Sequence, residues 1–272
     1  MIPGVAVGLA VVWYLVKGGA RWWAWAAWLV ARLSPWTRAL HAWVLSAPAT
    51  FAYVAIFTAS TIIQRSAPPQ LINVLTTLQS TNVVRLRLAP LSTLLDSALW
   101  VAGHGAGLSV YILLFVTIVA WAERRYGPPR MIVVWIAAHV LGSLLTAAVE
   151  THAITTGRAP VSLAYSTDVG VSYVLVGGAA AAVLVLRGRR ARMLAAVPFT
   201  LLLLAPLLVH RTFWDLGHLL AGACGMTAAW LTLRAGPPRR PPPPTTPAGA
   251  WRVYLGPRAR RVLAAIGLAP PP

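Results

Sequence analysis

The sequence predicts an all-α integral membrane protein, and three observations support this fold class. Of its 272 residues, 58% are hydrophobic and 10% are charged, and the mean hydropathy is +0.70. A soluble protein of this length would need far more charged residues to cover its surface. Apolar runs of about the 20 residues needed to cross a bilayer alternate with short arginine-rich segments, as in a multi-pass membrane protein.

Six apolar runs are long enough to cross about 30 Å of hydrocarbon as helices rising 1.5 Å per residue. We expect these spans near residues 42–64, 98–122, 131–150, 169–186, 193–210 and 214–233. Ahead of them, residues 2–16 are apolar but short for a span, and residues 20–33 are rich in tryptophan. The segment 1–41 therefore adds either one extra membrane helix or a helix lying on the membrane surface.

The positions of the arginines predict the orientation of the six spans. Arginine clusters at 123–130, at 187–192 and after residue 233 alternate with loops that carry less positive charge, although the long loop 65–96 is an exception. Because positively charged loops stay in the cytoplasm, we expect a multi-pass protein of the cell membrane whose core has both ends in the cytoplasm. The net charge of +18 is spread over these loops, so the predicted partners are anionic lipids and not nucleic acid.

The C-terminal residues 235–272 differ in composition from the spans. Residues 235–250 are too rich in proline to pack as a helix, and the basic, apolar segment after them suits anionic headgroups, with a disordered tail as the alternative. The chain is thus predicted to have three parts, which are the N-terminal segment 1–41, the six-span core 42–234 and the cytoplasmic tail 235–272.

Ser172 and His218 occupy matching positions in two spans that are predicted to run in the same direction. Each lies about four residues, or about 6 Å, inside its helix, so the two side chains can meet. A serine becomes a nucleophile when a neighbouring base such as histidine removes its proton. The alternative is that Ser172 makes the ordinary hydrogen bonds of serines packed between membrane helices.

Residues around this pair suggest supporting roles. Gly170 would let a substrate backbone come close, and the unpaired N–H groups of the first turn near Ser172 could face an oxyanion. Asp168 and Asp215 are expected to cap their helices. Asp168, Asp215 and His218 could instead form an ion or metal site, but they lack a tight ligand spacing, so we predict neither a metal nor a cofactor.

Two more polar residues lie in or beside the spans. Glu123 ends the second span next to arginines and is expected to be solvated there. His139 lies in the middle of the third span and is expected to make a structural hydrogen bond, because an unpaired polar group is costly within a membrane.

Three motifs within residues 42–233 resemble those of the rhomboid family of intramembrane serine proteases. Gly170-Val171-Ser172 stands where that family has Gly-x-Ser at the start of its fourth span. GHLLAGACG (217–225) resembles the sixth-span pattern Ala-His-x-x-Gly-x-x-x-Gly, and ERRYG (123–127) matches Glu-x-x-x-Gly at the end of the second span. The resemblance implies a rhomboid-like bundle of six transmembrane helices, with a Ser–His dyad that needs no aspartate in a water-filled cavity.

The chain also departs from the family pattern. Tyr173 follows the serine where the family has glycine, which places a bulky residue beside the nucleophile. Counting back from Glu123, the second-span histidine and asparagine that help bind the oxyanion in the family fall near Gly107 and Tyr111. His104, one helical turn away, is the candidate substitute, and the first loop has no Trp-Arg pair.

Two functions follow from these observations. The first is an intramembrane serine protease that cleaves transmembrane helices near their outer ends with Ser172 and His218. The alternative is a catalytically inactive rhomboid-like protein that binds client membrane helices in a lateral opening.

Reporter fusions test the predicted orientation. A fluorescent protein that folds only in the cytoplasm should be bright when fused at residue 190 and dark at residue 158, because the first site lies among arginines. A phosphatase that works only outside the cytoplasm should give the opposite result. Reversed signals would place Ser172 and His218 at the inner leaflet.

Overall fold

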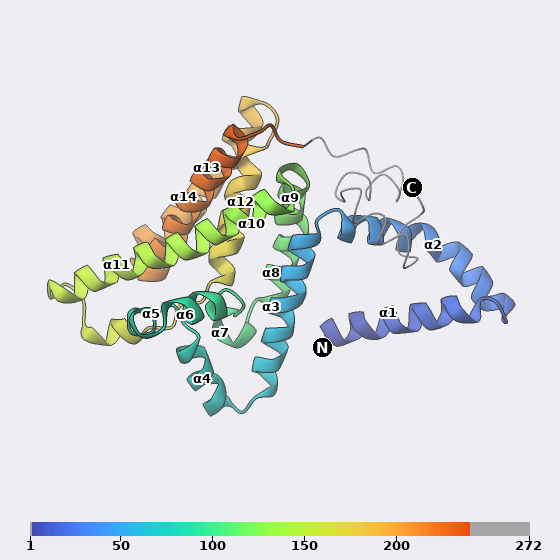
Figure 1. Ribbon diagram of the computed structural model, residues 1–272, viewed down its shortest axis with the longest axis horizontal. Coiled ribbons are helices and arrows are strands. Elements are labelled where there is room, and N and C mark those ends of the chain that lie inside the picture. Colours follow the sequence, from blue (N-terminus) through green and yellow to red (C-terminus); the bar gives the residue numbers. More distant parts are fainter. Residues whose placement is uncertain (1, 240–272) are drawn as a thin grey trace. The chain divides into compact units, whose positions relative to one another are not determined.

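The structure is a computed structural model that describes residues 2–239, apart from the side chains of residues 2–7, Pro69 and His104. All regular structure in these residues is helical (Figure 1), as the sequence predicts. The described chain divides into two compact units, one up to Ser46 and one from Ala47 onward. The predicted tail lies outside the described residues from residue 240.

The N-terminal unit consists of two helices, α1 (Ile2–Gly19) and α2 (Ala24–Leu45). Large apolar side chains are exposed on both, and the most exposed tryptophans of this unit are Trp22, Trp23, Trp25, Trp28 and Trp36. Exposed tryptophans suit the boundary between lipid and water. An extra span and a surface helix both stay predictions for this unit.

The second unit contains six helical runs in the predicted order. They are α3 (Pro48–Ser66); α8 (Leu108–Leu114) with η1 (Phe115–Val119) and α9 (Ala120–Tyr126); α10 (Pro128–Ile136) with η2 (Ala137–Leu141) and α11 (Gly142–Thr155); α12 (Val171–Leu184); α13 (Arg189–Val209); and α14 (Phe213–Arg234). Among the described residues, three runs are long and apolar enough on their own to cross a membrane, namely 128–155, 189–209 and 213–234. The prediction of an all-α membrane bundle is confirmed.

Two of the expected spans start later than predicted, for local reasons. The first run begins at Pro48, because proline is well suited to the first helical position. Proline also has no N–H group, so it cannot continue the backbone hydrogen bonds of the helix before it. The second begins at Leu108 and not near residue 98, since Gly103, Gly105 and Gly107 all have positive φ angles and interrupt the helix.

The long first loop folds into short helices, α4 (Pro69–Leu78), α5 (Val83–Leu88), α6 (Pro90–Ser97) and α7 (Ala102–Gly105), which lie near the start of α12 (Figure 1). Backbone hydrogen bonds join the loop to that start. The N–H of Thr81 donates to the carbonyl of Asp168 at 2.9 Å, and the N–H of Gly170 donates to the carbonyl of Ser97 at 2.8 Å. The loop therefore fixes the segment that leads into α12.

Glu123 is buried, so the expectation that it is solvated is wrong. Its carboxylate accepts hydrogen bonds from the N–H groups of Ala49 at 3.0 Å and Thr50 at 2.7 Å. These N–H groups belong to the first turn of α3 and have no partner within their own helix. Glu123 therefore joins the end of α9 to the start of α3.

Helices α12 and α14 approach each other closely where two glycines face. A Cβ atom added to Gly225 would lie 2.5 Å from the Cα of Gly177. Membrane helices lack a strong hydrophobic drive to associate, so small residues that permit such close contact stabilise their packing. The contact fixes the register of α12 against α14.

Substitution of Gly225 tests this packing. Gly225→Ala should lower stability by about 1–3 kcal/mol, because the new methyl group would overlap the backbone of α12. Gly8→Ala is the matched control, since a Cβ at Gly8 in α1 meets no atom within 4 Å. Unfolding of both variants in detergent measures the difference, and equal stability of the two would contradict the proposed contact.

Candidate active site

Ser172 is the second residue of α12 and is half-buried. The helix starts after Gly170, which is the N-cap residue and has no side chain that could cap the helix. The hydroxyl of Ser172 donates to the carbonyl of Val169 at 3.4 Å, a long hydrogen bond. The serine oxygen is therefore held only weakly by its own helix.

His218 lies in the second turn of α14, whose start is fixed by a capping box. The Thr212 hydroxyl accepts a hydrogen bond from the N–H of Asp215 at 3.3 Å, and the Asp215 carboxylate accepts one from the N–H of Thr212 at 3.3 Å. Thr212 is thus the capping residue, and Asp215 supports it from the first turn. The Trp214 indole N–H also donates to the Thr167 carbonyl at 2.9 Å, which links the start of α14 to the segment before α12.

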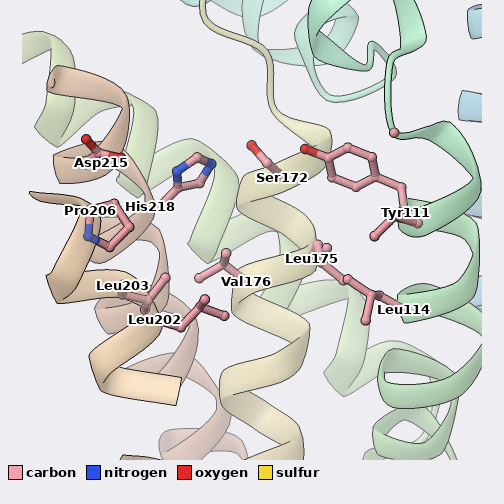
Figure 2. A pocket seen from close by; sticks show the side chains of 12 residues that line it. Tyr111, Leu114, Ser172, Leu175, Val176, Leu202, Leu203, Pro206, Asp215 and His218 are labelled. Carbon is pink, nitrogen blue, oxygen red and sulfur yellow. The ribbon is translucent and has the colours of Figure 1, made fainter. Parts of the chain in front are cut away.

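Ser172 and His218 line the same cavity, which has a volume of about 420 Å³ (Figure 2). Helices α12, α13 and α14 form one part of its wall, and α8 with the residue before it forms the rest. The lining residues are mostly apolar: Gly107, Val110, Tyr111, Leu114, Ser172, Leu175, Val176, Leu202, Leu203, Pro206, Asp215 and His218. A Ser–His pair at the polar end of an apolar cavity has the composition of a site for an apolar substrate.

Within the described residues, no hydrogen bond joins Ser172 to His218. The Tyr111 phenol extends from α8 toward the Ser172 side chain (Figure 2). The structure thus brings the two predicted catalytic residues to one cavity, while the dyad itself stays a prediction. Hydrogen bonds between catalytic groups are often long in structures without substrate.

The hydroxyl of Tyr111 is a site feature that the family motif does not indicate, because that motif has a different residue at this position. The sequence placed Tyr111 where the related family has an oxyanion-binding residue, and a tyrosine was counted as a departure. A phenol O–H is also a hydrogen-bond donor, and this one lies at the serine. Donor capacity at that position, and not residue identity, was the signal that could have identified it.

Asp168 does not cap α12, so that expectation is wrong. Its side chain accepts hydrogen bonds from the Tyr173 hydroxyl at 2.8 Å and from the Thr81 hydroxyl at 3.3 Å. Burial raises the pKa of Asp168 to about 6, and the Tyr173 and Thr81 hydroxyls oppose this shift by stabilising the carboxylate. Asp168 therefore connects the first loop to a side chain of α12.

Tyr173 does not narrow the cavity beside Ser172, contrary to the concern raised by the sequence. Its side chain is 1% exposed and is absent from the cavity lining, because it points from α12 toward α14. A Cβ atom added to Gly217 would overlap the Tyr173 hydroxyl and lie 2.7 Å from the ring carbon Cζ. The glycine before His218 thus makes room for the tyrosine after Ser172.

Gly170 is a glycine for a reason that the sequence did not reveal. A Cβ atom at this position would overlap the His139 ring, with its Nε2 at 3.0 Å. His139 in turn lies 2.8 Å from the Leu94 carbonyl and 3.3 Å from the Ser97 hydroxyl through Nε2, as expected of a structural histidine. The approach of a substrate backbone to Gly170 stays a prediction.

The remaining candidate residues gain no further support. His104 lies in α7, and its side chain is outside the described part of the chain, so its role at the oxyanion stays a prediction. Across the described residues, no group of three or more His, Cys, Asp or Glu side chains could hold a metal ion.

The chain belongs to the rhomboid-like protein family, because a sequence model of that family matches residues 42–237. The match spans all six helical runs and the cavity. No curated protein and no solved structure matches the chain.

Proposed function

We propose that the protein is an intramembrane serine protease in which Ser172 is the nucleophile and His218 is the general base. The observation that carries this proposal is that the two residues, from different helices, line one cavity whose remaining wall is mostly apolar. The rhomboid-like family supports it at the level of a membrane protein of this fold.

The proposed reaction follows the chemistry of serine hydrolases. The Ser172 oxygen attacks the peptide carbonyl while its proton passes to the His218 ring, and the ring then protonates the leaving amine as the C–N bond breaks. Water, deprotonated by the same histidine, hydrolyses the acyl-enzyme ester and restores Ser172. No carboxylate needs to bond to the histidine directly, and Asp215 acts on His218 through its nearby charge.

Tyr111 is the proposed oxyanion donor. Its hydroxyl lies at Ser172, where negative charge develops on the carbonyl oxygen after attack. The N–H groups of the first turn of α12 are additional donors, because they have no partner within the helix. These groups would replace the histidine and asparagine of the related family.

The composition of the cavity suggests the substrate class. Leucine, valine and proline side chains from α12 and α13 surround the pair, and they suit an apolar segment entering from the membrane. If both ends of the core are cytoplasmic, the cavity opens toward the outer leaflet, and transmembrane helices would be cleaved near their outer ends. Arginine clusters at the cytoplasmic ends would bind anionic lipid headgroups.

Binding of client helices without catalysis is the second candidate function. The specific observation that favours it is that the Ser172 hydroxyl donates to the Val169 carbonyl, while no hydrogen bond joins it to His218 within the described residues. A serine without a hydrogen bond to a base is not activated, whereas the apolar cavity could still accommodate a membrane helix.

Probe labelling and cleavage distinguish the two functions. A fluorophosphonate should label the purified protein, and Ser172→Ala and His218→Ala should each reduce labelling and cleavage of a co-expressed membrane substrate to background. The double variant should fall no lower, because the two groups act as one unit. Tyr111→Phe should slow cleavage about 100-fold, the cost of one oxyanion donor.

Ser143→Ala is the matched control, since Ser143 is a buried serine of α11 outside the cavity lining. It should retain full labelling. If the wild-type protein takes up no probe and cleaves no substrate, while client helices co-purify with it, the protease proposal is wrong and the binding function is supported.

A further inference from the structure

The Tyr173 ring packs against the edge of the His218 imidazole. The ring centroids are 5.5 Å apart and the planes meet at 79°, an edge-to-face arrangement that is favourable between aromatic rings. Tyr173 is 1% exposed, so this contact lies inside the protein. No hydrogen bond to the His218 ring is present among the described residues, so the ring contact with Tyr173 is the contact of defined geometry that the structure shows for this side chain.

The hydroxyl of Tyr173, at the far end of its side chain, is also held in place. Its hydroxyl donates to the Asp168 carboxylate at 2.8 Å and also interacts with the Thr146 side chain of α11. Asp168 is itself held by the first loop, because its N–H donates to the Ser80 hydroxyl at 2.5 Å and its carbonyl accepts from the N–H of Thr81 at 2.9 Å. The tyrosine ring therefore has little freedom to rotate.

We infer that Tyr173 is a positioning residue that holds the His218 ring in place beside Ser172, with the Asp168 carboxylate fixing the tyrosine in turn. In a Ser–His–Asp triad the carboxylate bonds to the histidine and sets its orientation. Here the carboxylate acts through an intervening phenol ring. The tyrosine transfers no proton, and its contribution is orientation alone.

This inference rests on the proposed function, in which His218 is the base for Ser172. It goes further because it assigns a role to two residues outside the dyad. It also explains Gly217, since a larger residue directly before His218 would overlap the Tyr173 hydroxyl and displace the ring from the imidazole.

Histidine NMR measures the contact without requiring catalysis. The full chain in detergent micelles, labelled with ¹³C at histidine Cε1, gives a His218 resonance that is identified by its loss in His218→Ala. Tyr173→Leu should shift this resonance, because the imidazole loses the adjacent aromatic ring. Tyr173→Phe should shift it less and broaden it, since the ring stays but its hydrogen bond to Asp168 is lost.

The labelling rate with a fluorophosphonate measures the consequence for Ser172. Tyr173→Phe and Asp168→Ala remove the same hydrogen bond, so each should slow labelling about 3- to 10-fold. The double variant should be no slower than either single one. Tyr173→Leu should slow labelling further, because the ring contact is lost as well.

Tyr126→Phe is the matched control, because Tyr126 is also a buried tyrosine, whose hydroxyl donates to the Ala181 carbonyl at 3.2 Å outside the cavity lining. It should change neither the resonance nor the rate. If Tyr173→Phe and Tyr126→Phe behave alike, Tyr173 only fills space and the inference is overturned. A His218 resonance that responds to Tyr173 variants in a protein that never labels would reject the proposed protease and keep the Tyr173–His218 contact.

Discussion

The close contact of α12 with α14 at Gly177 and Gly225 is the constraint on which the candidate site depends. With no side chain at either position, the two backbones come close enough to fix where the helices meet. Ser172 lies about 7.5 Å and His218 about 10.5 Å along their helices from these glycines, at 1.5 Å per residue. The serine and the histidine reach one cavity because the helices that carry them cannot slide.

The first loop supplies the second constraint. The Thr81 N–H donates to, and the Ser97 carbonyl accepts from, the segment that precedes α12, and Trp214 joins the start of α14 to that same segment. A membrane helix that begins after irregular backbone needs such partners, because the polar groups of that backbone and the first N–H groups of the helix are otherwise unsatisfied. The first loop therefore acts as a support for the site.

The residues next to the serine and the histidine differ in size from those of the family pattern. Tyr173 takes the place of a glycine, and Gly217 compensates by leaving space for its hydroxyl. Tyr111 brings a hydroxyl to the serine from the second helical run. With these changes the cavity keeps hydroxyl groups beside the serine, although the corresponding motif residues of the family are absent.

The class of protein, the order of the six helical runs and the two residues that share the cavity could all be predicted from the sequence. Hydropathy over about 20 residues and the spacing of short motifs are local properties, and local properties survive without a structure. The sequence-based expectations were wrong for Glu123, which was expected to be solvated, and for Asp168, which was expected to cap a helix. Their partners, the N–H groups of α3 and the Tyr173 hydroxyl, are either far away in sequence or on the side of a helix that only packing defines. Tertiary structure alone decided that Tyr173 points toward α14 and away from the cavity, because the space for its ring exists only where Gly217 meets α12.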